Sequence, residues 1–83
     1  MTDFHAQHAA GPAYGEGRDA YRTGKSIEEC LATSYYANHA PMIAGAWHVA
    51  RGYADAAKEA GADALTQARL ALAGSDYRRG ANR

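Results

Sequence analysis

The sequence predicts a small all-α protein: a hairpin of two main helices with a short capped turn between them, and an alanine-rich C-terminal helix. Three observations support this prediction. Of the 83 residues, 21 are alanine, the residue with the highest helix propensity. Small and aromatic residues recur at steps of three and four, as on one face of a helix. No segment of useful length alternates between apolar and polar residues, so β-structure is not expected.

The first main helix is expected over residues 13–23. Residues 1–12 show no clear period and end in Gly-Pro, which indicates a flexible N-terminal arm. Pro12 suits the first turn of a helix, where its missing N–H costs nothing. Gly24, followed by Lys25, is expected to end the helix. The face with helical spacing consists of Tyr14, Gly17, Ala20 or Tyr21, and Gly24.

A short capped turn should follow. Ser26 and Glu29 have the spacing of a capping box, in which the serine hydroxyl accepts from the Glu29 N–H and the Glu29 carboxylate accepts from the Ser26 N–H. The short helix should run to about Ala32. Residues 33–40 are expected to form a polar, tyrosine-containing loop, and Pro41 should open the second main helix.

The second main helix carries a narrow seam of mostly small residues, typical of closely paired helices. The seam consists of Ile43, Trp47, Ala50, Ala54, Ala57 and Gly61. Gly61 is expected to break or bend this helix.

A further alanine-rich helix should run from about Asp63 to Gly74. Residues 13–74 would then make one small helical domain and residues 75–83 a flexible basic tail. The alanine-rich helix can pack within the chain or on another copy, so a homo-oligomer is a further hypothesis. The helix carries Leu65, Ala68 and Leu72.

Composition limits what the chain can do. Only eight residues are Ile, Leu, Val or Phe, so a self-contained enzyme with a deep, water-excluding pocket is not expected. Nine Lys and Arg balance nine Asp and Glu, so any basic surface must be local. The single Cys30 cannot form an internal disulfide, which fits a reducing cytoplasm. Neither a membrane span nor a signal peptide is expected.

Glycines inside the predicted helices indicate that two backbones pack nearly in contact. Glycine in a helix costs about 1 kcal/mol relative to alanine, so its repetition needs a packing reason. Trp47 would cover the junction as a core residue. The alternative is that the glycines mark flexible or irregular segments. The small residues are Gly17, Ala20 and Gly24 in the first helix and Gly45, Ala46 and Ala50 in the second.

One stretch of the chain resembles a known family. The stretch is Gly17-Arg18-Asp19-Ala20-Tyr21-Arg22-Thr23-Gly24-Lys25-Ser26-Ile27-Glu28-Glu29-Cys30. It is similar to the opening signature of the ribosome modulation factor family, Gly-x-x-Ala-x-x-x-Gly-Lys/Arg-Ser-x-x-x-Cys, a family that also includes small CrpP-like proteins of plasmids and phages. The second signature of the family is similar to Gly45-Ala46-Trp47-His48-Val49-Ala50. A second register, Gly52-Tyr53-Ala54-Asp55-Ala56, fits almost as well.

The resemblance covers roughly residues 16–56 and implies two helices joined by an ordered connection, with a function on the ribosome. The chain departs from the family at Leu31 and Ala32, where Pro and Tyr are usual, and at Ile43, which replaces the first of two paired tryptophans. It is also neutral, whereas the enterobacterial member is strongly basic. The residues expected to carry the structural motif are Gly17, Ala20, Gly24, Ser26, Cys30, Gly45, Trp47 and Ala50.

A basic stripe on the first helix is the candidate nucleic-acid-binding site. Arg18, Arg22 and Lys25 fall at i, i+4 and i+7, so they would contact RNA phosphates while tyrosines stack on bases. The alternative is a solvated helix face neutralised by Glu16 and Asp19. The candidate binding residues are Arg18, Arg22, Lys25, Tyr21, Arg78 and Arg79, joined by Tyr14 and Arg83.

No catalytic residue, cofactor or metal is predicted. Thr23-Gly24-Lys25-Ser26 resembles the end of a P-loop, but Asp19 stands where the first glycine is required and no strand is expected before it. Cys30 is expected to be a small buried residue rather than a nucleophile. The possible ligands His5, His8, Cys30, His39 and His48 do not repeat at zinc-finger spacing.

The leading hypothesis is a non-enzymatic, ribosome-associated modulator that binds rRNA or a ribosomal protein and restrains translation, as the resemblance implies. The competing hypothesis is a protein–protein adaptor from a phage or mobile element, which would present a helical surface to a host protein. Neutral charge and a C-terminal third without a match in the family favour the adaptor. A CrpP-like antibiotic-modifying protein is a distant third, because phosphoryl transfer needs a phosphate cradle.

Overall fold

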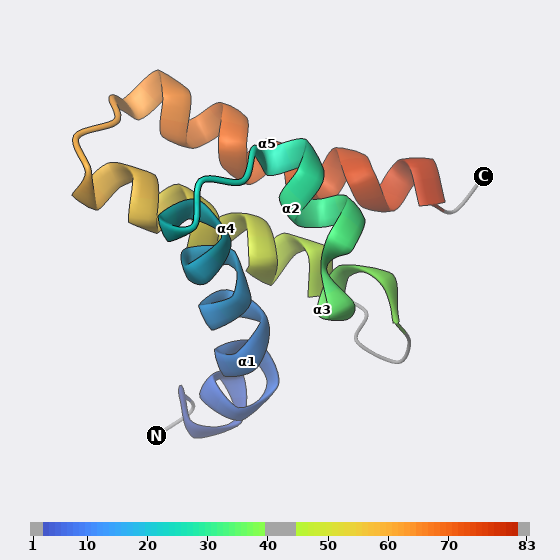
Figure 1. Ribbon diagram of the computed structural model, residues 1–83. Helices are drawn as coiled ribbons and strands as arrows, with labels where there is room; N and C mark the ends of the chain where they lie inside the picture. The colour runs from blue at the N-terminus through green and yellow to red at the C-terminus, as the bar shows by residue number, and fades with distance from the viewer. Residues whose placement is uncertain (1–2, 40–44, 82–83) are drawn as a thin grey trace.

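The computed structural model describes residues 3–39 and 45–81, with side chains over 11–39 and 45–77. These residues form five helices and no strand: α1 (Asp3–Arg22), α2 (Ile27–Thr33), α3 (Tyr35–Asn38), α4 (Gly45–Glu59) and α5 (Ala64–Ala81). Helix α4 is central. Helix α1 crosses one side of it and α5 runs back along another, while α2 and α3 pack near the first turns of α4 (Figure 1). The predicted all-α class is confirmed, but the arrangement is a five-helix globule rather than a two-helix hairpin.

Helix α1 is longer than expected. It begins at Asp3, so the predicted start near Ala13 is wrong, and Pro12 lies inside the helix rather than in its first turn. The residues before Pro12 include several alanines without an apolar period. A prediction based on apolar periodicity therefore finds no helix there, although the alanines have a high intrinsic helix propensity.

Helices α1 and α4 end in the same way, each with a glycine in the left-handed region. Gly24 has φ 86° and Gly61 has φ 105°, a conformation that only glycine adopts readily. After α1, the Lys25 N–H donates to the Ala20 carbonyl at 3.0 Å and the Gly24 N–H to the Tyr21 carbonyl at 3.1 Å. This pair of bonds is a Schellman motif, so the predicted stop at Gly24 and the predicted break at Gly61 are both confirmed.

The region between α1 and α4 is more helical than predicted. Ser26 caps α2 as expected, because its hydroxyl accepts from the Glu29 N–H at 3.1 Å. Part of the predicted loop over residues 33–40 is instead the short helix α3, where the Ser34 hydroxyl accepts from the Ala37 N–H at 3.0 Å. The carboxylate of Glu16 accepts from the Tyr35 N–H at 3.2 Å. A cap from a distant helix is invisible to local sequence patterns.

Helix α5 starts where the sequence predicted and ends later. Asp63 caps it by accepting from the Thr66 N–H at 2.8 Å. The predicted end at Gly74 is wrong, since the helix continues to Ala81. Gly74 is buried against α4, where an added Cβ would lie 2.6 Å from the Ala46 carbonyl oxygen. This glycine therefore permits close packing instead of ending the helix.

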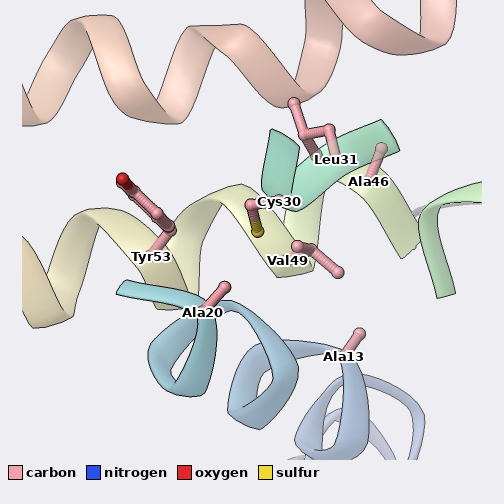
Figure 2. Packing of buried hydrophobic residues seen from close by; sticks show 7 residues of the cluster. All are labelled: Ala13, Ala20, Cys30, Leu31, Ala46, Val49 and Tyr53. Carbon is pink, nitrogen blue, oxygen red and sulfur yellow. The ribbon is translucent and has the colours of Figure 1, made fainter. Parts of the chain in front are cut away.

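The core is small and built mainly of alanine. Val49 is the largest side chain with no appreciable exposure, and Cys30 of α2 lies beside it, while Leu31 of α2 points toward α5 (Figure 2). The seam of α4 is buried at Ala50, Ala54 and Ala57, as predicted. Two residues of the predicted second helix, Pro41 and Ile43, lie outside the described residues. The core cluster comprises Ala13, Ala20, Cys30, Leu31, Ala46, Val49 and Tyr53 (Figure 2).

Trp47 is not part of this core, which corrects the prediction that it covers the helix junction as a core residue. Its side chain is 39% exposed in the first turn of α4. Tyr53 supplies the large buried aromatic instead, and its hydroxyl donates to the Lys25 carbonyl at 2.6 Å. The indole sits six residues earlier on α4, so the helix turns it away from the face that carries Tyr53.

Candidate nucleic-acid interface

Two glycines bring the backbones of α1 and α4 into contact. A Cβ on Gly17 would lie 1.9 Å from the Val49 carbonyl oxygen, and one on Gly52 would lie 2.0 Å from the Tyr14 carbonyl oxygen. The predicted close approach is therefore confirmed for Gly17. On α4, the glycine at the α1 crossing is Gly52, which belongs to the second of the two sequence registers.

The other predicted motif residues divide between packing and capping. Ala20, Cys30, Gly45 and Ala50 are buried. Gly24 has no atom within 4 Å of a hypothetical Cβ, so it ends α1 and takes no part in helix packing. Burial raises the pKa of the Cys30 thiol to about 11, with Glu16 adding to the rise and Lys25 opposing it. A thiol with this pKa is a weak nucleophile at neutral pH, in line with a packing role.

The predicted basic stripe holds one engaged cation and two accessible ones. Arg18 forms an ion pair of 2.7 Å with Glu59 across the α1–α4 crossing. This bond raises the pKa of Arg18 and lowers that of Glu59. Arg22 lies 3.9 Å from Asp19 with its side chain 57% exposed, and Lys25 donates to the Thr33 hydroxyl at 3.2 Å. Arg22 and Lys25 therefore remain available to an anionic partner.

The tyrosines of α1 are engaged inside the fold. Tyr21 packs edge-on against Tyr53 with ring centroids 5.3 Å apart. The Tyr14 hydroxyl donates to Asp55 at 2.5 Å, and this bond is the first cause of its raised pKa. Both rings therefore already have partners within the fold, and stacking of these rings on bases stays a prediction. The side chains of Arg78 and Arg79 lie outside the described part of the chain.

The structure contains an exposed aromatic–cation pair that the sequence did not predict. The guanidinium carbon of Arg51 lies 4.8 Å from the centroid of the Trp47 indole, one helical turn away. His48 packs edge-on against the same indole at 4.9 Å. On α3, Tyr35 is exposed and stacks on His39 with centroids 4.3 Å apart. The i, i+4 spacing of Trp47 and Arg51 is the sequence signal for this pair, but the core position that the sequence predicts for Trp47 argues against it.

The hollow beside the P-loop-like segment has the wrong charge for phosphate. It measures about 180 Å³ and lies between the C-terminal half of α1 and helix α2. Two carboxylates, Glu16 and Asp19, line it together with Lys25 and the buried Cys30. Carboxylates repel a phosphate, so the charge of this hollow is unfavourable for nucleotide binding.

Two further features are absent from the described residues. Their side chains include no group of three or more His, Cys, Asp or Glu that could share a metal ion. None of their helices combines the length and apolarity needed to cross a membrane. No family model, curated protein or solved structure matches the chain.

Proposed function

We propose that this protein is a non-enzymatic, ribosome-associated modulator that binds rRNA or a ribosomal protein and restrains translation, as the ribosome modulation factor family does. One observation carries the proposal. Gly17 and Gly52 belong to the two sequence motifs that resemble the family, and they meet at a single helix crossing. The glycine in each motif thus has one physical explanation: any larger residue would prevent the two helix backbones from making contact.

The contact surface would lie at the C-terminal end of α1. Arg22 and Lys25 would neutralise phosphates there, since both remain accessible. Arg18 would have a structural role instead, because Glu59 already satisfies its guanidinium. Neutral overall charge makes this binding depend on local placement of cations, with little long-range steering.

The proposal predicts that Arg22→Glu releases the protein from ribosomes without unfolding it. Reversing an exposed charge at a phosphate contact should weaken association about tenfold, and the neutral Arg22→Gln should weaken it less. Cosedimentation with ribosomes through a sucrose cushion measures the bound fraction. Arg69→Glu is the matched control, because it reverses an exposed cation on α5, away from the basic stripe. Equal pelleting of Arg22→Glu and wild type would contradict the proposal.

A protein–protein adaptor is the second candidate, and one observation favours it. Leu65 and Leu72 lie two turns apart on α5 and are 60% and 59% exposed. Two large aliphatic side chains on one helix face fit an apolar partner surface better than RNA. Salt distinguishes the two candidates, because RNA binding weakens steeply as salt is added and an apolar interface does not.

A further inference from the structure

The position of Trp47 is unusual for a protein with so small a core. It is the single tryptophan of the chain, and its indole is the largest apolar group that the sequence could bury. The fold nevertheless buries alanines and Val49 while leaving Trp47 39% exposed. Stability alone would favour burying the indole. The exposed part of the indole is therefore available to a ligand.

Arg51 gives the exposed indole a positive charge. Its guanidinium lies over the ring at 4.8 Å, and Arg51 forms no ion pair within the part of the chain that the structure describes. Asp55 stands one turn further along α4, but its carboxylate accepts from the Tyr14 hydroxyl instead. The N–H donors of Arg51 thus remain available to an incoming anion.

The surroundings leave the guanidinium accessible. A hollow of about 300 Å³ between α4 and α5 has Arg51 and Asp55 on one side and the small side chains of Ala64, Ala68 and Ala71 on the other. His48 adds no charge at neutral pH, since burial and then the nearby Arg51 lower the pKa of its imidazole. Arg51 is therefore the cation next to the indole.

We propose that Trp47 and Arg51 form a stacking site for an unpaired base of single-stranded RNA. The base lies on the solvent-exposed part of the indole and the adjoining phosphate pairs with the guanidinium. A flat aromatic surface beside an unpaired cation suits a single strand, which offers both base faces and phosphates. An RNA duplex stacks its bases against one another, so it offers phosphates, 2′-hydroxyls and base edges but no free base face. This inference rests on the proposed RNA-binding function and names the form of RNA that the protein contacts.

The test uses the full chain and two labelled probes, a short single-stranded oligoadenylate and a blunt RNA duplex. The fluorescence of Trp47 should be quenched by the single strand, and no other tryptophan contributes to the signal. Trp47→Ala should weaken binding of the single strand about tenfold by anisotropy, and Trp47→Phe should weaken it less because a smaller ring remains. Arg51→Ala should lower the slope of log affinity against log salt by about 0.7. Arg69→Ala is the matched control, and the single strand should quench its Trp47 fluorescence as it does that of wild type.

Helical circular dichroism shows whether each variant folds. The inference is overturned if the single strand leaves Trp47 fluorescence unchanged, if folded Trp47→Ala and Trp47→Phe bind like wild type, or if the duplex binds as tightly as the single strand. Ribosome cosedimentation without quenching by the single strand would overturn this inference and leave the proposed function standing. Quenching without ribosome cosedimentation would support the stacking site and contradict the ribosomal function.

Discussion

At the scale of single residues, two glycines determine how closely α1 approaches α4. Gly17 and Gly52 each face a backbone carbonyl from the opposite helix, so neither position has room for a methyl group. Gly15 lies on the same helix as Gly17 but has no atom within 4 Å of a hypothetical Cβ. A comparison of substitutions at Gly15 and Gly17 therefore separates the packing role of glycine from its intrinsic effect on helix stability.

Gly17→Ala should destabilise the protein by about 3 kcal/mol, because the new Cβ forces two backbones apart. Gly15→Ala should stabilise it by about 1 kcal/mol, since alanine is the better helix former and the site is open. Urea unfolding followed by circular dichroism measures both changes. Equal stability of the two variants would show that the crossing is looser than the structure indicates.

Some of the site residues could be predicted from the sequence and others could not. The glycine at position 17 was identifiable because helical spacing placed it on a face of small residues. The sequence could not show that Arg22 is more accessible than Arg18, because Glu59, the partner of Arg18, lies on a different helix. The average behaviour of tryptophan predicts a core position for Trp47, and only the rotation of α4 places its indole at the surface.

At the scale of helices, capping residues fix most boundaries. Asp63 caps α5 through the Thr66 N–H, and this hydrogen bond is the first cause of its lowered pKa. Boundaries with such local signals, at Gly24, Ser26, Gly61 and Asp63, agree with the sequence prediction. Boundaries that depend on packing between helices differ from the sequence prediction. Gly74 appeared to end α5, yet its lack of a side chain allows α5 to pass close to Ala46.

The cap at Asp63 predicts a specific loss of stability in acid. Its carboxylate has a lower pKa in the folded chain than the ordinary value of 3.8, so its contribution is complete above that value and disappears as pH falls through the folded pKa. Asp63→Asn keeps an oxygen acceptor that does not titrate. Its urea midpoint should therefore fall less than that of wild type as pH drops below 3.8.

Asp63→Ala completes this comparison, because it removes both the acceptor and the titration. It should be less stable than Asp63→Asn at neutral pH and equally free of this acid-dependent loss. Parallel decline of wild type and Asp63→Asn in acid would assign the loss to other carboxylates. Glu59 has a lowered pKa as well, but wild type and both variants share it.

At the scale of the whole molecule, contacts between distant segments compensate for the small core. Tyr53 links α4 to the turn after α1 through the Lys25 carbonyl, and Tyr77 of α5 donates to Asn38 of α3. Glu16 ties α1 to α3 through the Tyr35 N–H. These links are long-range in sequence, which explains why the sequence predicted a hairpin with an appended helix and the structure is a five-helix globule.

Cys30 offers a direct measure of how tightly this globule closes. It is a residue of α2, is 2% exposed, and lies beside Val49 of α4 (Figure 2). A rise in pKa from 9.0 to about 11 by itself lowers the thiolate fraction about a hundredfold at pH 8.

A thiol-reactive dye should therefore label native protein at least about a hundredfold more slowly than protein in concentrated urea, and burial should slow it further. Gly17→Ala should speed native labelling by the same factor as it raises the unfolding equilibrium constant, because dye reaches Cys30 chiefly when the helices separate. The rate in urea should be the same for both proteins and serves as the control. Native labelling within about tenfold of the urea rate would mean that Cys30 becomes accessible through local motion of α2, without separation of α1 from α4.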